Sequence, residues 1–255
     1  MGSTLLDRPE VAFLVLLITG HVFADFLVQT RYVAETKLQK PAILLRHGLL
    51  TLVTHGVLVL PFLDRFVLAG LVGLGLFHTL IDGLRGYLVR ESRRPLLLFF
   101  SDQALHIGSI VLLWRILLTV DVPLAEPHWL PLTRLPQLTT ACLITAGYVF
   151  NGRGGTTIVR QVLEGFPLVL PGVQGGTSRI DNMGRTIGCL ERYLIFTLVL
   201  IGEWGALGFV LAAKSIARFR ELENQAFADY YLIGTLTSVV VAVATGITIR
   251  LVLGL

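Results

Sequence analysis

Charged residues are scarce in this chain. They make up 15% of its 255 residues, whereas 54% are hydrophobic, and the mean hydropathy is +0.75. An average soluble domain carries about 25% charged residues. The composition therefore excludes an ordinary soluble protein, and most of the chain is expected to have lipid as its solvent.

Cysteine is also scarce. Cys142 and Cys189 have no metal-type spacing and define no disulfide framework. The net charge of +4 is a small basic excess in short loops, which indicates orientation in a membrane and gives no support to a nucleic-acid partner. Membrane lipids are the partners to expect. The first apolar run lacks the basic lead and cleavage site of a signal peptide, so we expect a permanent helix there.

Long apolar runs dominate what is present. A membrane span needs roughly 20 mainly apolar residues and must be helical, because lipid offers no partner for an open backbone. The candidate runs are residues 11–28, 42–62, 66–88, 96–120, 135–150, 187–213 and 230–249. The sequence therefore predicts an all-α, polytopic transmembrane helical bundle of about seven spans.

The loops suggest how this bundle is divided. Residues 121–134 are rich in proline and carry Trp129, which is typical of an external interfacial loop. They would separate a four-helix core, residues 1–120, from a C-terminal half of about three spans, residues 135–255. Between the fifth and sixth runs, the semi-apolar residues 158–170 suggest a re-entrant or interfacial segment.

Basic residues predict the orientation, because short cytoplasmic loops collect positive charge. The loops that contain Lys37 and Arg93 should be cytoplasmic, and the loop at Pro127 and the N-terminus external. The sixth run has basic residues before it, such as Arg185, and after it, such as Lys214. One helix cannot place both ends on one side, so the sequence leaves the topology of the second half open.

Histidine and aspartate recur at one spacing inside the first four runs. HVFAD, HTLID and DQALH give the pairs His21 and Asp25, His78 and Asp82, and Asp102 and His106; the second run adds His47 and His55. Side chains at i and i+4 share a helix face, so an imidazole and a carboxylate can reach one cation. Because successive spans alternate in direction, all eight should lie toward the cytoplasmic ends of four helices.

Such a set predicts a shared polar site. A charged group near a span centre costs about 2.5 to 3.5 kcal/mol on insertion scales, so eight groups of this kind imply common partners or a cation. Mixed imidazole and carboxylate ligands suit zinc, manganese or ferrous iron, and the absence of cysteine argues against a closed structural zinc site. We expect zinc or manganese, held or oriented by His21, Asp25, His78, Asp82, Asp102 and His106, with His47 or His55 as ligand or general base.

Three alternatives stay open for this set. The metal site can be dinuclear, or a single cation whose histidines are oriented by carboxylates. Without metal, hydrogen-bonded His and Asp pairs would serve packing or proton relay. A third alternative is a haem held by His47 or His55 together with His106, but this would leave the paired aspartates buried without a role in binding it.

A weaker polar set lies in the sixth run, at Glu191, Glu203 and Lys214. Glu203 falls near the middle of that run, so it is expected to face the bundle interior and to have a partner there. The glycine-rich segment 151–157, NGRGGTT, would suit an anion-binding nest before a short helix, although one such turn is a weak signal.

The motifs also resemble a family. HVFADFLVQ, RHGLLTLVTH, FHTLIDGLRGYL and SDQALHI are similar to the pattern of the uncharacterised membrane family with domain-of-unknown-function number 3307, over about the first 120 residues. MGRTIGCLERYL and EWGALGFVLAAKSIARF look like the C-terminal part of its longer members. The resemblance implies a bacterial inner-membrane protein and stresses the same His and Asp positions, but it supplies no activity.

The function that these residues favour is a membrane-embedded metal-dependent hydrolase, acting on a lipid or membrane-associated substrate near the cytoplasmic face. A divalent cation or proton transporter or channel is the alternative, since intramembrane His and Asp also mark ion pathways. The outer halves of the first four runs are almost wholly apolar, which favours a closed site over a pathway. A non-catalytic scaffold or regulatory protein, or a homo-oligomer, is also compatible with the sequence.

Overall fold

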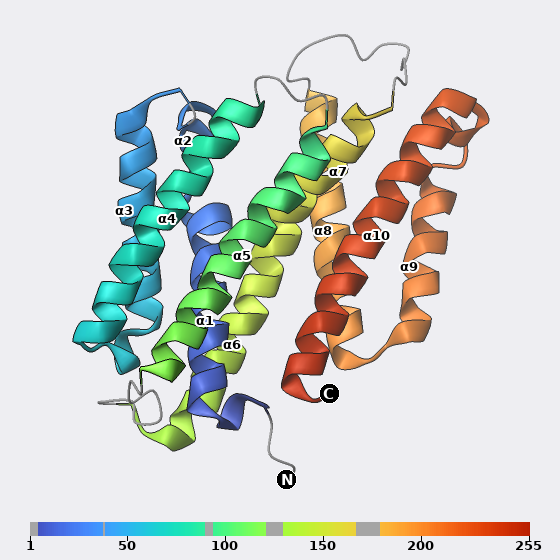
Figure 1. Cartoon of the computed structure of the whole chain (residues 1–255). Helices are drawn as coiled ribbons and strands as arrows, with labels where there is room; N and C mark the ends of the chain where they lie inside the picture. Colours follow the sequence, from blue (N-terminus) through green and yellow to red (C-terminus); the bar gives the residue numbers. More distant parts are fainter. Residues whose placement is uncertain (1–4, 38, 90–93, 121–129, 167–178) are drawn as a thin grey trace. The chain divides into compact units, whose positions relative to one another are not determined.

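The computed structural model describes residues 5–37, 39–89, 94–120, 130–166 and 179–255, and all regular structure in these ranges is helical (Figure 1). Five helical stretches are long and apolar enough to cross a membrane: Pro9–Val28, Pro41–Leu58, Arg65–Leu88, Pro95–Thr119 and Gln225–Leu253. They correspond to five of the seven predicted runs and indicate a membrane protein. The predictions for Arg93, Pro127 and Trp129 fall outside the described residues.

The chain forms two compact units. The first comprises Met1–Ala146 with Val252–Gly254, and the second comprises Gly147–Leu251 with Leu255. The predicted core, residues 1–120, lies in the first unit, which extends further along the chain.

Four long helices build the first unit. The helical elements are a 3-10 turn at Leu5–Asp7, α1 (Pro9–Phe23), a π-helical turn η2 (Ala24–Val28), α2 (Arg31–Thr36), α3 (Pro41–Leu58), a 3-10 turn at Leu60–Phe62, α4 (Arg65–Val89), α5 (Pro95–Thr119), a 3-10 turn at Leu132–Arg134 and the start of α6 (Leu135–Val149). Proline opens α1, α3 and α5, where its missing N–H costs no helical hydrogen bond. Helix α1 packs on α3 and α5, α3 packs on α4, and α4 packs on α5, so the four helices close into a bundle.

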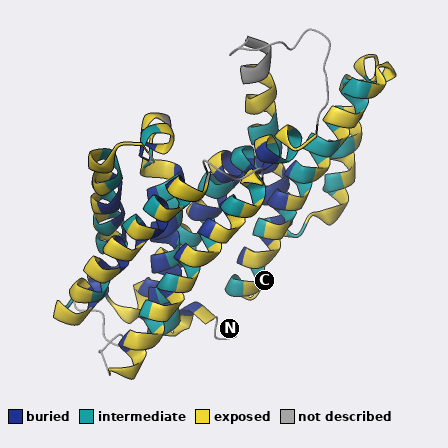
Figure 2. Cartoon of the chain, turned by 45° about the horizontal axis from the view of Figure 1, so that its top comes forward, coloured by how far each residue is buried: buried dark blue, intermediate teal, exposed yellow. Residues whose placement is uncertain are grey.

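The bundle is apolar outside and partly polar inside. Leu49 and Val53 on α3 and Leu80 on α4 are exposed, whereas His47 and His78 on the same helices are buried. Figure 2 shows exposed and buried positions alternating along the long helices. This distribution suits a lipid solvent, in which polar side chains turn to the interior. Helix α1 with η2 is the most enclosed of the candidate spans, since 56% of its most apolar stretch of 18 residues is buried, against 22 to 39% for the other spans.

The interior is divided along the bundle axis. One half is an apolar core that includes Phe13, Leu16, Leu71, Ile110 and Leu117. The buried histidines and aspartates fill the other half. A polar site is thereby sealed at one end by packed apolar side chains.

Helices α3 and α4 approach closely at Gly48, which gives a testable prediction. A Cβ atom at Gly48 would lie 2.1 Å from Thr79 Oγ1, and that hydroxyl donates to Gly75 O at 2.8 Å. We expect Gly48→Ala to lower the stability by about 1 to 3 kcal/mol through overpacking. Thermal unfolding in detergent measures this. Gly56→Ala on the same helix is the control, because a Cβ there meets nothing within 4 Å; equal losses in both variants would contradict the close approach.

The second unit begins within a continuous helical stretch. Helix α6 runs into a π-helical turn, η5 (Phe150–Gly154), and then into α7 (Gly155–Glu164). The segment 151–157 is therefore helical and does not form the anion-binding nest that the sequence suggested. The semi-apolar residues 158–170 begin in α7, and those from 167 on are outside the described residues.

The remaining helices are α8 (Arg179–Ile201), α9 (Trp204–Ala217) and α10 (Gln225–Leu253), with a 3-10 turn at Glu221–Glu223 between the last two. The predicted run 187–213 is corrected here, because it is two helices and not one. Gly202 adopts φ +82°, a conformation that favours glycine and ends α8. Arg250 donates to Val199 O at 3.2 Å and to Leu200 O at 2.8 Å, which satisfies the last carbonyls of α8.

This break changes the place of two predicted polar residues. Glu203 lies in the turn between α8 and α9, directly before α9 begins, and not in the middle of a span. Lys214 on α9 reaches back to Glu191 on α8, with 2.5 Å between Nζ and Oε2. The two helices therefore run antiparallel, and the basic residues of both lie toward the same end.

Candidate metal centre

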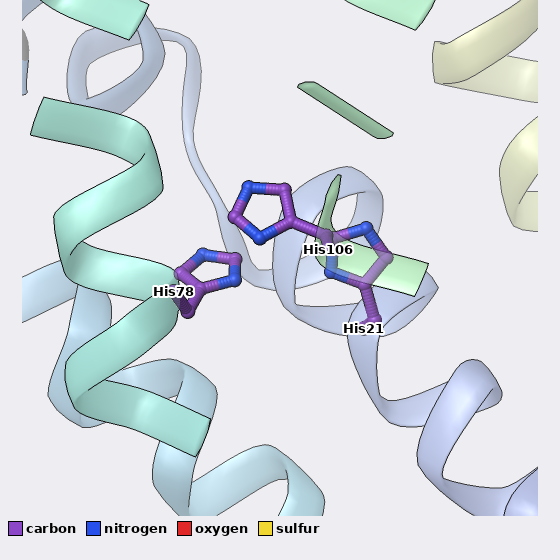
Figure 3. A group of neighbouring side chains, drawn as sticks. All are labelled: His21, His78 and His106. Carbon is purple, nitrogen blue, oxygen red and sulfur yellow. The ribbon is translucent and has the colours of Figure 1, made fainter. Parts of the chain in front are cut away.

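Seven of the eight predicted site residues meet inside the first unit. They come from every long helix of the bundle: His21 on α1, Asp25 in η2, His47 on α3, His78 and Asp82 on α4, and Asp102 and His106 on α5. Figure 3 shows His21, His78 and His106 turned toward one another from three helices. Their ring centroids lie 4.1 to 5.7 Å apart. The His and Asp pairs that the sequence predicted within single helices therefore also contact one another across helices.

The π-helical turn after α1 places Asp25 in this cluster. Such turns insert one extra residue and are frequent at functional sites. Asp25 Oδ2 lies 4.0 Å from His21 Nε2 on its own helix, whereas Asp25 Oδ1 lies 3.2 Å from His47 Nε2 on α3. The stronger contact of Asp25 is therefore with the neighbouring helix.

A first ligand group consists of Asp25, His47 and His78. The Nε2 atoms of His47 and His78 are 3.2 Å apart, and Asp25 Oδ1 lies 3.2 Å from the first and 3.6 Å from the second. Ligand atoms bound tetrahedrally at 2.0–2.1 Å from zinc are about 3.3 Å apart. The three atoms are thus spaced as one face of a metal coordination sphere.

A second ligand group consists of Asp82, Asp102 and His106. His106 Nε2 lies 3.9 Å from Asp82 Oδ1 and 3.6 Å from Asp102 Oδ1. All three atoms are buried, and none has a hydrogen-bond partner in the described part of the chain. Buried polar atoms are nearly always satisfied, and leaving one unsatisfied costs about 1 to 3 kcal/mol. Three unsatisfied lone pairs that face one another fit a cation.

Asp82 belongs to both groups through its two oxygens. Its Oδ1 faces His106, while its Oδ2 lies 3.4 Å from His47 Nε2 and 3.5 Å from His78 Nε2. His21, His78 and His106 form a further set whose ligand atoms lie within 4.8 Å of one another. The donor set is larger than one four-coordinate cation needs.

Lys37 completes the surroundings of Asp82 and was missed as a site residue. Its Nζ donates to Asp82 Oδ2 at 2.6 Å, and the side chain is buried after the short helix α2. The sequence indicated Lys37 only as a cytoplasmic loop charge. The contact spans 45 residues along the chain, so no local spacing signals it.

Arg85 and Gln103 hold the second group from the other side, and both were also missed. Arg85 Nη1 donates to Asp102 Oδ2 at 3.0 Å, and Gln103 Nε2 donates to the same oxygen at 3.2 Å. Gln103 Oε1 lies 3.2 Å from His21 Nε2. The sequence did contain a signal for both residues, because each is a polar residue close to a site aspartate within an apolar run. Arg85 follows Asp82 by three positions, on the same helix face, and Gln103 directly follows Asp102.

The electrostatic balance favours a further cation. Three carboxylates, from Asp25, Asp82 and Asp102, face two basic side chains, Lys37 and Arg85. The third carboxylate charge is left to be balanced by a protonated imidazole or by a bound cation. A buried site of this kind attracts positive ions.

His55 lies apart from the ligand groups. Its Nδ1 is 2.8 Å from Thr51 O in its own helix, and its ring packs on Gly20, where a Cβ atom would lie 3.0 Å from the ring. It is not in any of the sets whose ligand atoms converge within the described residues. Of the two histidines considered as general base, His47 is the one in the cluster.

The polar residues predicted in the sixth run belong to the second unit. Glu191 and Lys214 pair with each other, and the Lys214 amine also lies 5.1 Å from the centre of the Tyr231 ring. Glu203 is at the α8–α9 turn. These positions give the pair a role in holding α8 to α9.

Comparison with known families places the cluster within a recognised domain. Residues 13–128 match a family model described as protein of unknown function (DUF3307), which confirms the resemblance of the motifs in the first half of the chain and does not extend to those after residue 128. All seven clustered residues fall within the matched range. Comparisons with curated proteins and with solved structures gave no match. The activity must therefore be argued from the site.

Proposed function

We propose that this protein is a membrane-embedded, metal-dependent hydrolase that acts on a lipid or membrane-associated substrate near the cytoplasmic face. The observation that carries the proposal is the second ligand group. His106 Nε2 lies 3.9 Å from Asp82 Oδ1 and 3.6 Å from Asp102 Oδ1, and these three buried atoms have no hydrogen-bond partner in the described residues. A packing role would leave these atoms unsatisfied, whereas a cation would satisfy all three.

We infer two cations, zinc or manganese, with Asp82 shared between them. The first would be held by Asp25, His47 and His78, and the second by Asp102 and His106, with one oxygen of Asp82 toward each. This choice is supported by the two oxygens of Asp82 facing different ligand groups.

The neighbouring side chains would position and assist the reaction. When bound, such cations supply Lewis acidity, which activates water and polarises an ester or phosphate group. Gln103 and Arg85 orient His21 and Asp102. The Lys37 amine beside Asp82 is suited to stabilise the negative charge that develops on an ester or phosphate in the transition state.

The depth of the cluster favours a hydrolase over a transporter. Asp25 lies three residues from the end of the span Pro9–Val28, and Asp82 six residues from the end of Arg65–Leu88. His47 lies six residues after Pro41, so all three are within about two helical turns of the same side. The opposite half of the bundle is the apolar core around Phe13 and Leu71. A path for ions would need polar groups there as well.

We propose that the side nearest the cluster is cytoplasmic, in the inner membrane of a bacterium. The exposed Lys40 in the loop before α3, at the end of the bundle nearest the cluster, supports this orientation. Within the second unit, the antiparallel pairing of α8 with α9 brings Arg185 and Lys214 toward one end, so the basic residues there no longer conflict. The hairpin α8–α9 would enter and leave on the cytoplasmic side.

Cysteine labelling tests this orientation. Single cysteines at Lys40, Arg220 and Leu132, which are exposed, would be introduced after replacing Cys142 and Cys189 by alanine. A membrane-impermeant thiol reagent added to intact cells should label position 132 and leave positions 40 and 220 unlabelled until the membrane is opened. If only one of positions 40 and 220 is labelled in intact cells, the two lie on opposite sides of the membrane and the proposed hairpin is wrong. If position 40 is the one labelled, the proposed orientation of the bundle is wrong as well.

Hydrolysis itself is tested with the purified protein in lipid nanodiscs. Phosphate or fatty-acid release from a panel of phospholipids and lipid phosphates should require zinc or manganese. His78→Ala and Asp102→Ala should lower it by at least about a hundredfold. Glu203→Gln is the control, since that residue lies in a turn of the second unit. Normal function of the two ligand variants in a complementation assay, with loss in Glu203→Gln, would instead favour transport of a divalent cation or protons.

A further inference from the structure

The second unit contains a pocket that the metal centre does not use. It has a volume of about 270 Å³ and lies between η5 with the start of α7 and the early turns of α8. Its polar lining is mainly basic or hydroxylic: Arg153, Thr156, Arg185, Thr186 and Tyr193. Leu190 and Cys189 supply an apolar side.

A buried arginine lies next to this pocket, behind one of its lining residues. Arg192 is 2% exposed, and its Nη2 donates to the pocket residue Thr156 at Oγ1 over 2.6 Å. Its other hydrogen bonds go to Asn151 O, Gly152 O and Ser238 Oγ. All of these partners are neutral oxygens, so the contacts satisfy the donors of the guanidinium without neutralising its charge.

The glycines of the NGRGGTT segment make this arrangement sterically feasible. A Cβ atom at Gly152 would lie 2.5 Å from Tyr193 Oη, and one at Gly155 would lie 2.7 Å from Arg192 Nε. Both neighbours line or support the pocket. The motif thus serves to bring the helix backbone against the arginine and tyrosine of α8.

We propose that this pocket binds the phosphate group of an anionic ligand, of the kind carried by a phospholipid headgroup. The guanidiniums of Arg153 and Arg185, which come from separate segments, can donate hydrogen bonds to phosphate oxygens, because the planar guanidinium matches the geometry of a phosphate. The hydroxyls of Thr156, Thr186 and Tyr193 add donors, and Leu190 offers an apolar surface to the attached chain. Inorganic phosphate shares the recognised group and is distinguished from lipid by experiment.

The arrangement differs from arginines that merely reach a membrane surface. Isolated arginines near a helix end extend toward headgroups without forming a site. Here two arginines and three hydroxyls from two segments line one open pocket, and a third, buried arginine is hydrogen-bonded to one of those hydroxyls. The proposal stands independently of the metal centre and of hydrolysis.

The test is a binding titration of the full chain in phosphatidylcholine nanodiscs. Phosphatidylglycerol is added in one arm and inorganic phosphate in the other, and binding is followed by native mass spectrometry and thermal stability. Arg153→Gln and Arg185→Gln should each weaken phosphatidylglycerol binding by at least about tenfold. Arg160→Gln is the matched control, because Arg160 is an exposed residue of α7 paired with Glu164. Leu190→Trp should block the pocket without changing its charge.

Each outcome decides the proposal. Tight phosphatidylglycerol binding that is lost in the arginine variants and in Leu190→Trp, but kept in Arg160→Gln, supports a lipid headgroup site. Binding of inorganic phosphate with the same variant pattern supports the phosphate site and removes the need for the lipid chain. If Arg160→Gln weakens binding as much as the other arginine variants do, the effect comes from general surface charge and the proposed site is wrong. The absence of binding in both arms would also overturn it.

Discussion

Replacing Asp82 by alanine should remove both metal ions from the purified protein. Asp82 is the only residue of the cluster whose two oxygens face different ligand groups in the described structure, Oδ1 toward His106 and Oδ2 toward His47 and His78. Elemental analysis of tag-free protein should fall from about two ions per chain to near none. His47→Ala and Asp102→Ala should each remove one ion, because each alters a single group.

Asparagine at position 82 refines this test. It keeps one acceptor oxygen and places an amide N–H₂, which cannot bind a cation, on the other side. We expect one ion to remain, with a fold closer to that of the parent protein. Asp229→Ala is the matched control for loss of one carboxylate, since Asp229 is exposed in the second unit. Folded wild-type protein that is active and free of metal would refute the metal centre as a whole.

Replacing Lys37 by methionine should make the metal-free protein far less stable and more dependent on metal. The substitution keeps an extended apolar side chain but leaves Asp82 buried without its amine partner, and breaking a buried ion pair in this way costs about 3 to 5 kcal/mol. In a chain of this size that corresponds to a fall in Tm of about 6 to 20 °C. Added zinc or manganese should restore most of the loss, because a cation at Asp82 replaces the missing positive charge.

Thermal unfolding with and without a chelator measures this effect. Lys40→Met is the control, because Lys40 is exposed in the neighbouring loop. A similar fall in Lys40→Met would assign the loss to the loop as a whole. A fall in Lys37→Met that metal does not reverse would show that the lysine is needed for packing and not as a counter-charge.

The clustering of the ligands could be predicted because its main signal is local. The pairs His21 and Asp25, His78 and Asp82, and Asp102 and His106 follow from the i, i+4 geometry of a helix, and the alternation of spans gives their common depth. The role of Lys37 could not be predicted in this way. It depends on how the turn after α2 brings Lys37 to Asp82 on α4, which leaves no periodic pattern in the sequence.

The break between α8 and α9 could not be predicted from hydropathy, although hydropathy identified the other spans. Hydropathy is averaged over a long window, so the two polar or flexible positions Gly202 and Glu203 inside an apolar run barely alter it. The turn depends on the positive φ of Gly202 and on the distant Arg250, which caps the end of α8. Basic residues at both ends of the run were the one available sign of two helices.

The enclosed position of α1 has a consequence for the order of assembly. This helix has a mean hydropathy of 2.3 and precedes the other helices of the bundle along the chain, so it leaves the ribosome and enters the bilayer before the helices that will surround it. The first ligand group is complete once α4 has been inserted, whereas the second waits for Asp102 and His106 on α5. A nascent chain would therefore acquire its two ligand groups in sequence, and the first could hold a cation while α5 is still being translated.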